Sequence, residues 1–287
     1  IKNFGNMNYP FWINDFDRIK NYKEKYPLAS EIFDYPQAFW YGDNPKKPKK
    51  WMEKSIQRLL KRAEPQLPIF VMYNIPNRDV GQYSKGGAKT RERYIDFVER
   101  FAKGIGDTEA IIIYEPDALA HSTLLDEKEQ TWRLELMKES LQILTDNCKG
   151  LVYVDVGHSS WLHYNDVAEL LDRVSNPMVR GFSVNVCNYR TTKESLNWGK
   201  KICRLRPDDT FIIDTSRNGQ GPLNIEWCNP PQRGLGEPPT TETEHKTCDA
   251  YLWIKIPGES DGKCNGGPKA GKFWGEQAEE LVKYKKE

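Results

Sequence analysis

Seven apolar stretches, each about as long as a β-strand, recur along the chain, and this repetition constrains the fold more than any other feature. Most of them are continuous rather than alternating, which is typical of strands buried on both faces. They occupy residues 35–41, 68–75, 109–116, 150–157, 179–186, 209–216 and 250–257. The stretches between them place apolar residues at helical spacing among charged ones, at 49–63, 91–106, 130–147, 164–174, 191–205 and 272–286.

The alternation of strand and helix predicts an α/β fold with a parallel sheet. About seven such units in 287 residues predict a distorted parallel (β/α) barrel that closes on itself. Residues 216–249 are the exception, because they are rich in Gly, Pro and Asn and have no helical period; we expect an ordered functional loop there. No linker or low-complexity tract divides the chain, so we expect one domain over residues 1–287.

Charge and hydropathy exclude several classes of partner. The 42 basic residues nearly balance the 41 acidic ones, so neither nucleic acid nor an anionic membrane is expected to bind. No apolar run approaches the roughly 18 residues of a membrane-spanning helix. The first residues, IKNFGNMNYPFWIN, lack the basic and then apolar pattern of a signal peptide. This start is compatible with a cytosolic protein or with a mature secreted domain.

Cysteine and histidine usage gives no reason to expect a metal or another cofactor. The six cysteines form no C-x-x-C pair and only four histidines are present, so a zinc site is not expected. One or two disulfides in a secreted enzyme and six free thiols in a cytosolic one both fit this usage.

Polar side chains follow most of the predicted strands, where parallel strands of a barrel form one rim. Carboxylates gathered at one rim raise at least one pKa by repulsion and desolvation, which suits glycoside hydrolysis or a divalent metal site. For Asp155 and Asp214 the alternative is a buried hydrogen-bonding role, such as fixing His158 or Arg217. The strand ends carry Tyr73 and Asp79, Glu115 and Asp117, Asp155 and His158, Asn185 and Asn188, Asp214, and Lys255, Glu259 and Asp261.

Aromatic residues are abundant, with 9 Trp and 14 Tyr in a hydrophilic chain. Some fill the core, and others have the flat apolar rings with polar tips that suit a sugar-binding surface.

Seven blocks in order, from about residue 35 to 275, resemble glycoside hydrolase family six, the cellulases that comprise endoglucanases and cellobiohydrolases. The resemblance implies a distorted seven-stranded β/α barrel, a catalytic domain over residues 1–287, and hydrolysis of β-1,4-glucan with inversion. The blocks are MYNIPNRD, IIIYEPDALA, VYVDVGHSSW, GFSVNVCNY, FIIDTSRNGQGP, EWCNPP and LWIKIPGESDG.

The resemblance also implies four catalytic roles. Asp117 matches the general acid that protonates the glycosidic oxygen. Asp79 matches the residue that raises the pKa of that acid and touches a chain of waters. Asp261 matches a carboxylate that is either the general base or an electrostatic support for the transition state. Tyr73 matches the tyrosine beneath the −1 sugar, which enforces ring distortion.

Further positions match sugar-binding residues of the family. Trp40 matches a stacking platform at subsite −2. The loop 78–89 matches a mobile active-site loop, in which a serine helps to position the attacking water. Counting from Asp79 gives Lys85 at that place, with Ser84 beside it, and the adjacent Gly86–Gly87 pair is expected to supply flexibility. The other matches are Trp161, Trp227, His158, Asn188, Lys255 and Glu259, of which Trp161, Trp227 and His158 fit a packing role equally well.

The resemblance predicts one disulfide, Cys228–Cys264, and therefore secretion into an oxidising compartment. A second bridge of the family is absent, because Val80 and Leu125 occupy its two positions. The four remaining cysteines, at 148, 187, 203 and 248, match no family bridge and are expected to be free.

In the family that the chain resembles, the chain-end enzymes roof their cleft with longer loops in two places, so short loops here imply an open cleft and an endo-acting enzyme. Asp79 and Asp117 are only 38 residues apart, and the predicted bridge encloses only 35. We expect an endo-β-1,4-glucanase that acts as a secreted monomer on cellulose and cello-oligosaccharides. The alternatives are a cellobiohydrolase, a non-catalytic glucan-binding barrel and a metal-dependent hydrolase.

Overall fold

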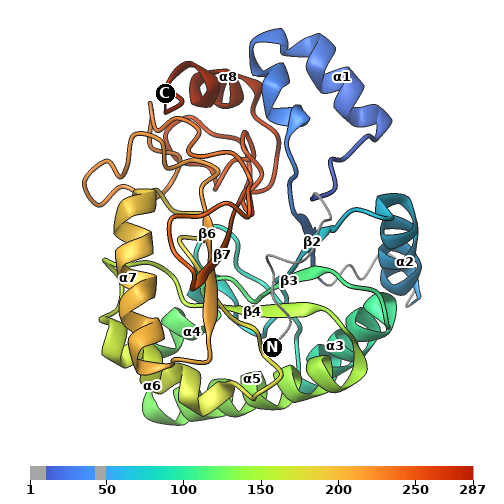
Figure 1. The fold of residues 1–287 in the computed structure, drawn as a ribbon, viewed down its shortest axis with the longest axis vertical. Helices are drawn as coiled ribbons and strands as arrows, with labels where there is room; N and C mark the ends of the chain where they lie inside the picture. Colours follow the sequence, from blue (N-terminus) through green and yellow to red (C-terminus); the bar gives the residue numbers. More distant parts are fainter. Residues whose placement is uncertain (1–10, 43–49, 287) are drawn as a thin grey trace.

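Seven parallel strands form one curled sheet in the computed structural model, which describes residues 11–42 and 50–286 (Figure 1). The strands pair in sequence order, and each overlaps its predicted stretch, so the predicted strand count and the parallel sheet are confirmed. They are β1 (Phe39–Tyr41), β2 (Ile69–Met72), β3 (Ile111–Tyr114), β4 (Leu151–Asp155), β5 (Gly181–Val184), β6 (Thr210–Asp214) and β7 (Cys248–Leu252).

The curled sheet remains open between its first and last strands, which differs from the predicted closure. Among the described residues no ladder joins β1 to β7. The backbone N–H of Ala38 donates to the carbonyl of Trp253 at 3.3 Å, and the indole of Trp40 donates to the carbonyl of Ile254 at 2.9 Å. Strand β1 has only three residues. The bonds from Ala38, just before β1, and from Trp40, within it, therefore connect this edge of the sheet to the segment after β7 in place of a ladder. The architecture is therefore a distorted half-barrel.

Helices cover the convex side of the sheet and follow one another around it (Figure 1). All six predicted helical stretches contain a helix. Residue 49, the first of the stretch 49–63, lies outside the described residues. Residues 1–10, which were compared with a signal peptide, also lie outside them. No helix among the described residues is both long and apolar enough to cross a bilayer. The six are α2 (Trp51–Ala63), α3 (Arg91–Ile105), α5 (Glu127–Asn147), α6 (Tyr164–Val174), α7 (Thr192–Leu205) and α8 (Gly275–Lys283).

Several short elements were not predicted. Helix α1 (Asp17–Lys25) buries only Ile19, so its sequence has no apolar stripe to reveal it. It packs with α8 against a 3₁₀ segment, Pro27–Asp34. The four-residue helix α4 (Ala118–His121) is separated from the end of β3 by three residues and lies near the candidate site.

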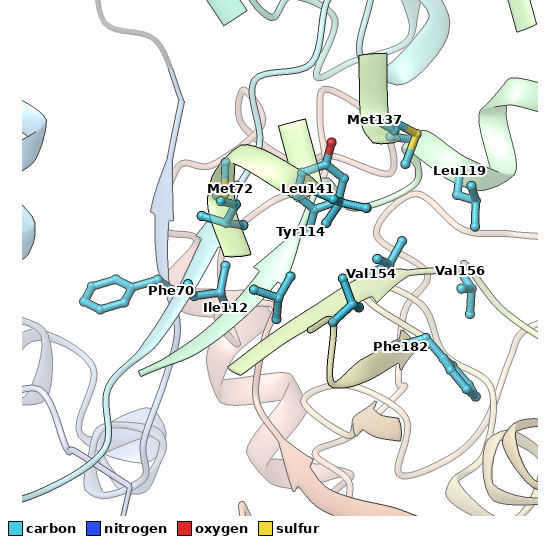
Figure 2. Close-up of a cluster of buried hydrophobic side chains, with 14 of the residues drawn as sticks. Phe70, Met72, Ile112, Tyr114, Leu119, Met137, Leu141, Val154, Val156 and Phe182 are labelled. Atoms are coloured by element: carbon cyan, nitrogen blue, oxygen red, sulfur yellow. The ribbon is translucent and has the colours of Figure 1, made fainter. Parts of the chain in front are cut away.

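The continuous apolar strands have two faces, and both are buried. Phe70 and Met72 of β2 belong to the cluster that packs against the helices, whereas Ile69 and Val71 of the same strand face the interior of the curled sheet. Figure 2 shows the outer cluster, in which Met137 and Leu141 of α5 also lie. Because alternate residues serve two cores, the strands show no polar alternation.

Helix starts carry side-chain caps that the sequence makes visible. Thr90, Asp126 and Thr191 precede α3, α5 and α7, and each accepts a hydrogen bond from a backbone N–H three residues later. Each cap satisfies one of the orphan donors at the start of its helix.

A core substitution tests this packing. The rings of Phe182 and Phe211 are fully buried and stack with centroids 5.5 Å apart. Phe211→Ala should lower the free energy of unfolding by about 3–5 kcal/mol, because it removes apolar contact and leaves a cavity. Urea denaturation measures the change. Leu205→Ala is the control, since Leu205 is 51% exposed and should change stability by no more than about 0.5 kcal/mol. Equal losses for the two variants would contradict this packing.

Candidate active site

The carboxyl ends of the strands surround a cavity of about 650 Å³. Every residue predicted for catalysis or sugar binding lines it, so the structure brings all twelve together. They are Trp40, Tyr73, Asp79, Ser84, Asp117, His158, Trp161, Asn188, Trp227, Lys255, Glu259 and Asp261.

A strained turn after β3 directs Asp117 into this cavity. Glu115 and Asp117, which flank Pro116, both have left-handed backbone conformations, with φ of 47° and 68°. The carboxylate of Glu115 is fully buried and accepts the backbone N–H groups of Asn74 at 2.8 Å and Ile75 at 3.0 Å. Glu115 therefore points into the protein while Asp117 faces the cavity. Left-handed residues other than glycine cost energy, so the surrounding contacts must hold this turn in place.

Asp155, at the end of β4, supplies one such contact. Its carboxylate accepts the backbone N–H of Asp117 at 2.7 Å, the N–H of Gly157 at 3.2 Å and the hydroxyl of Ser183 at 3.1 Å. The buried hydrogen-bonding role that the sequence offered for Asp155 is confirmed, but its partners are these three donors and not His158. The carboxylate is needed instead by backbone donors at the strand end, which would otherwise be buried without an acceptor.

Asp214, at the end of β6, also binds backbone N–H groups at the rim. Its carboxylate accepts backbone N–H groups from both neighbouring strand ends, so the expected buried hydrogen-bonding role is confirmed, with these donors in place of Arg217. The four donors are Cys187 at 3.1 Å, Ser216 at 3.0 Å, Ile254 at 3.3 Å and Lys255 at 2.9 Å.

Asp117 is held in its protonated form. Burial raises its pKa well above the ordinary range, and the negative charges of Asp155, Asp79 and Asp261 raise it further. Burial also raises the pKa of Asp155 to about 7, although its hydrogen bonds oppose that shift. A carboxylic acid in this environment can donate a proton at pH values where an exposed one would be ionised.

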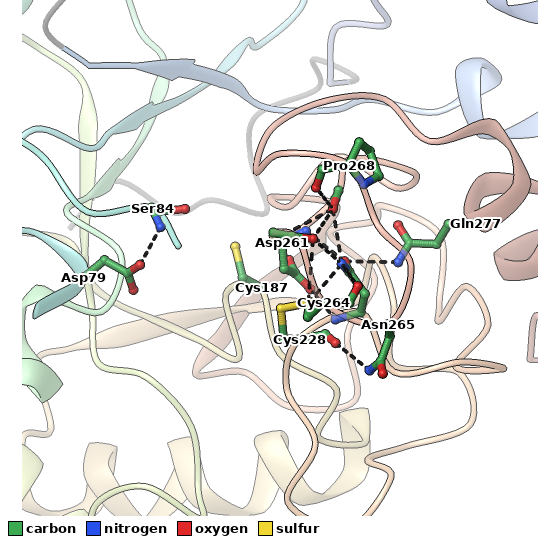
Figure 3. The surroundings of a disulfide bond; sticks show 12 residues. Asp79, Ser84, Cys187, Cys228, Asp261, Cys264, Asn265, Pro268 and Gln277 are labelled. Carbon is green, nitrogen blue, oxygen red and sulfur yellow. Dashed lines mark hydrogen bonds between the residues drawn. A yellow bond between two sulfur atoms is a disulfide. The ribbon is translucent and has the colours of Figure 1, made fainter. Parts of the chain in front are cut away.

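Asp79 lies in the loop that follows β2 and holds that loop together. Its carboxylate accepts the backbone N–H of Ser84 at 2.7 Å, and burial raises its pKa (Figure 3). The guanidinium group of Arg78 donates to the carbonyls of Ser84 and Tyr73 and lies 4.6 Å from the centre of the Tyr73 ring. Both Ser84 and Lys85 line the cavity, so both remain candidates for the position that the family gives to serine.

Asp261 has the opposite electrostatic environment. Burial alone would raise its pKa, but the cations of Arg217, at 2.9 Å, and Lys255, at 3.2 Å, outweigh burial and hold the pKa below its ordinary value. The carboxylate also accepts the hydroxyl of Tyr189 at 3.2 Å and the backbone N–H of Asn229 at 3.1 Å. It is therefore ionised, and its lone pairs are largely engaged.

The aromatic and polar residues form two groups around Asp117. Trp40 packs edge-on against Tyr73, with ring centroids 5.4 Å apart. Burial raises the pKa of Glu259, which lines the same side with Lys255. On the other side, after β4, the ring centroids of Trp161 and His158 are 5.6 Å apart. Burial lowers the pKa of His158 to about 4.

The loop after β2 reaches across the cavity. The ring of Tyr83 lies directly on Gly262, where an added Cβ would come within 2.4 Å of it, and its centroid is 6.0 Å from that of Trp227. The glycine pair in this loop was expected to give flexibility. The structure shows a different requirement at Gly87, whose φ is +88° and where a Cβ would lie 1.9 Å from the carbonyl oxygen of Ile75.

Within the described parts of the chain, no group of three or more His, Cys, Asp or Glu side chains is arranged to hold a metal ion. Asp155 and Asp214 instead bind backbone donors, and Asp261 binds the cations of Arg217 and Lys255.

Comparison with known proteins identifies this arrangement. The model of glycosyl hydrolases family 6 matches residues 12–285, nearly the whole chain. The chain belongs to glycosyl hydrolase family 6. It is 41% identical over 257 residues to Endoglucanase A of Cellulomonas fimi, a match that covers 89% of this chain and 56% of that protein. The chain therefore spans little more than half the length of this relative.

A solved endoglucanase from Mycobacterium tuberculosis, in complex with a thio-linked methyl cellobiosyl cellobioside, is similar in both sequence and fold. It has a TM-score of 0.91 and 36% identity over 97% of this chain and 98% of that one. A probable 1,4-β-D-glucan cellobiohydrolase C of Aspergillus niger is 31% identical over 238 residues, covering 67% of this chain and 51% of that protein.

The predicted disulfide is present in this family 6 site. Cys228 and Cys264 are bonded, with Cα atoms 6.1 Å apart, and the cysteines at 148, 187, 203 and 248 are free (Figure 3). Asn229, next to the bridge, accepts the backbone N–H of Asp261 at 2.8 Å and donates to the carbonyl of Gly262 at 2.9 Å. The bridge thus fixes the segment that places Asp261.

Sequence reasoning missed several residues of the site. Arg217 and Asn229 lie inside blocks that carry the family resemblance, but nothing in those blocks shows that both bind Asp261. Tyr189 and Cys187 follow the predicted end of β5 and were passed over. His121 also lines the cavity, and its position four residues after Asp117, one helical turn away, could have revealed it.

Reducing the bridge should destabilise the protein. Opening a loop of this size lowers the free energy of unfolding by about 3–4 kcal/mol in the chain-entropy model. Denaturation with and without reductant measures the loss. The double variant Cys228→Ser/Cys264→Ser is the control, because reductant should not destabilise it further. Mass spectrometry of the non-reduced protein that found both thiols alkylated would show that the bridge does not form.

Proposed function

We propose that this protein is an endo-β-1,4-glucanase that hydrolyses cellulose and related β-1,4-glucans with inversion at the anomeric carbon. The observation that carries the proposal is the pair of acids in one cavity, Asp117 with a raised pKa and Asp261 with a lowered one. Aromatic rings with polar neighbours line the same cavity, as a sugar-binding cleft requires.

Asp117 is the proposed general acid. Its proton passes to the glycosidic oxygen as the bond to the anomeric carbon breaks, so that the leaving sugar departs as a neutral alcohol. The turn around Pro116 and the hydrogen bond from its backbone to Asp155 hold this acid in a fixed position. Fixed positioning matters because proton transfer requires heavy atoms within hydrogen-bond distance.

Asp261 is proposed to act through its charge. The positive charge that develops at the anomeric carbon is stabilised by a nearby carboxylate. Arg217, Lys255, Tyr189 and Asn229 already engage Asp261, which favours this role over abstraction of a proton from water. Asp79 then receives the proton of the attacking water through a chain of waters, a role that is supported by its position in the lining of the same cavity.

The remaining residues of the site are proposed to bind the glucan. Tyr73 lies beneath the reacting sugar, with Trp40 as the platform for the next sugar on the non-reducing side. The acid, the platforms and the loop that covers them all come from one chain, which supports a monomer and one catalytic domain. The disulfide supports secretion into an oxidising compartment. The other proposed sugar contacts are Ser84, His158, Trp161, Asn188, Trp227, Lys255 and Glu259.

Endo action is favoured over cellobiohydrolase action by two observations. The relatives named endoglucanase are more similar to this chain than the Aspergillus cellobiohydrolase is. Among the described residues, the loop after β2 crosses the cavity and touches its far wall through the ring of Tyr83, which lies on Gly262 and near Trp227. A loop with a contact of this kind has to move in order to admit the middle of a chain.

Viscosity tests the mode of action. We expect the viscosity of a carboxymethylcellulose solution to fall steeply while few reducing ends have formed, because internal cuts shorten chains fastest. Asp117→Ala is the matched control and should lower the rate at least about 100-fold, since general acid catalysis contributes on that scale. Release of reducing ends without early loss of viscosity would favour the cellobiohydrolase instead.

The stereochemistry of the first product tests the mechanism independently. An inverting enzyme keeps its two carboxyl groups roughly 6.5–9.5 Å apart, so that water attacks the face opposite to the leaving group. In the proposed mechanism Asp117 is the acid and the proton of the attacking water passes to Asp79 through further waters, so no carboxylate attacks the anomeric carbon as it would in a retaining enzyme. Proton NMR during hydrolysis of cellotetraose should therefore show the α-anomer first. Initial appearance of the β-anomer would rule out inversion.

A further inference from the structure

His121 is a buried histidine in the cavity that none of the proposed roles uses. It ends the short helix α4, and its backbone N–H donates to the carbonyl of Asp117 at 2.8 Å. The side chain lines the cavity although the residue is only 3% exposed. Its Nδ1 atom is fully buried, and no partner for it is found among the described residues. Burial lowers the pKa of the imidazole to about 4, and the charge of Arg133 acts in the same direction.

The ring of His121 contacts Trp161 edge-on. Their centroids are 4.9 Å apart and their planes meet at 72°. Trp161 also lies against Gly157, where an added Cβ would be 3.1 Å from the indole, and His158 approaches it from 5.6 Å. The indole is therefore held between two imidazoles. A neutral imidazole is suited to this position, because it can pack against a ring and still form a hydrogen bond.

We propose that His121 contacts the substrate, forming a hydrogen bond through Nε2 to a hydroxyl group of a sugar on the leaving-group side of the scissile bond. This inference rests on the proposed function. Trp40 and Tyr73, from β1 and the end of β2, lie on the side assigned to the non-reducing sugars. His121 and Trp161 follow β3 and β4, and therefore flank Asp117 on the other side, where the leaving sugars would bind.

The chemistry of the two partners matches. Since Nδ1 is enclosed, Nε2 is the ring nitrogen that can reach the cavity. A sugar hydroxyl can both donate and accept, so it pairs with Nε2 in either tautomer of the imidazole. A hydrogen bond to Nε2 would give the ligand affinity and orientation, because a sugar hydroxyl that enters the cavity without finding a partner there is costly. The expected class of ligand is a β-1,4-linked glucose unit seated over Trp161.

Two substrates and one substitution separate this contact from a packing role. Cellotetraose places sugars on both sides of the scissile bond, whereas 2-chloro-4-nitrophenyl β-cellobioside has no sugar on the leaving side. His121→Phe keeps a ring against Trp161 but removes Nε2. We expect kcat/KM for cellotetraose to fall about tenfold, mainly through KM, a size typical of one lost hydrogen bond. For the aryl cellobioside, kcat/KM of His121→Phe should stay within about twofold of the wild-type value.

Further variants control the result. His121→Gln places an amide near the position of Nε2 and should restore part of the loss. His163→Phe alters an exposed histidine outside the cavity and should leave kcat/KM unchanged for both substrates. Equal losses on both substrates, or no loss on either, would overturn the inference. If His121→Phe fails to fold, His121→Leu takes its place in the same comparison.

Failure of the proposed function gives a different pattern. A wild-type protein that cleaves neither substrate refutes glucanase activity, and calorimetric binding of cellotetraose then decides about His121. Weaker binding by His121→Phe than by the wild type supports the contact. Equal binding by the two proteins, or no binding by the wild type, overturns it.

Discussion

Hydrogen bonds between buried carboxylates and backbone N–H groups at the strand ends determine where the side chains of the cavity lie. Glu115 ties the end of β2 to the turn after β3, Asp155 ties that turn to β4, and Asp214 ties the ends of β5, β6 and β7 together. A parallel sheet that curls without closing has no continuous ladder to fix this rim. The carboxylates provide the missing constraint, and removing one would leave several buried donors without acceptors.

The same rim shifts the pKa values of two buried acids in opposite directions, and because burial raises the pKa of both, the difference between them comes from their charged neighbours. Burial disfavours the charged form of both Asp117 and Asp261. Asp117 faces other carboxylates and keeps its proton, whereas Asp261 faces two cations and loses its own. A protonated donor and an ionised carboxylate can thus coexist in one cavity at the same pH, which is the division of labour that glycoside hydrolysis requires.

The seven strands and six helices could be predicted because apolar periodicity is a local property of sequence, and the site could be predicted because parallel strand ends converge. What could not be predicted depends on contacts between distant segments. The sequence of β1 does not show that it fails to pair with β7, and nothing near Asp155 shows that its partner is the backbone of Asp117. The pairing of Arg217 with Asp261 joins residues 44 positions apart through a loop without periodicity. Helix α1 escaped prediction because it buries a single side chain.

The contact of Tyr83 with Gly262 makes the two directions of traffic through the cavity unequal. On the proposed function, a polymer that arrives by its middle has to displace the ring, whereas the two halves left after cleavage each have a free end in the cavity and can slide out beneath it. Binding therefore requires a movement that release does not.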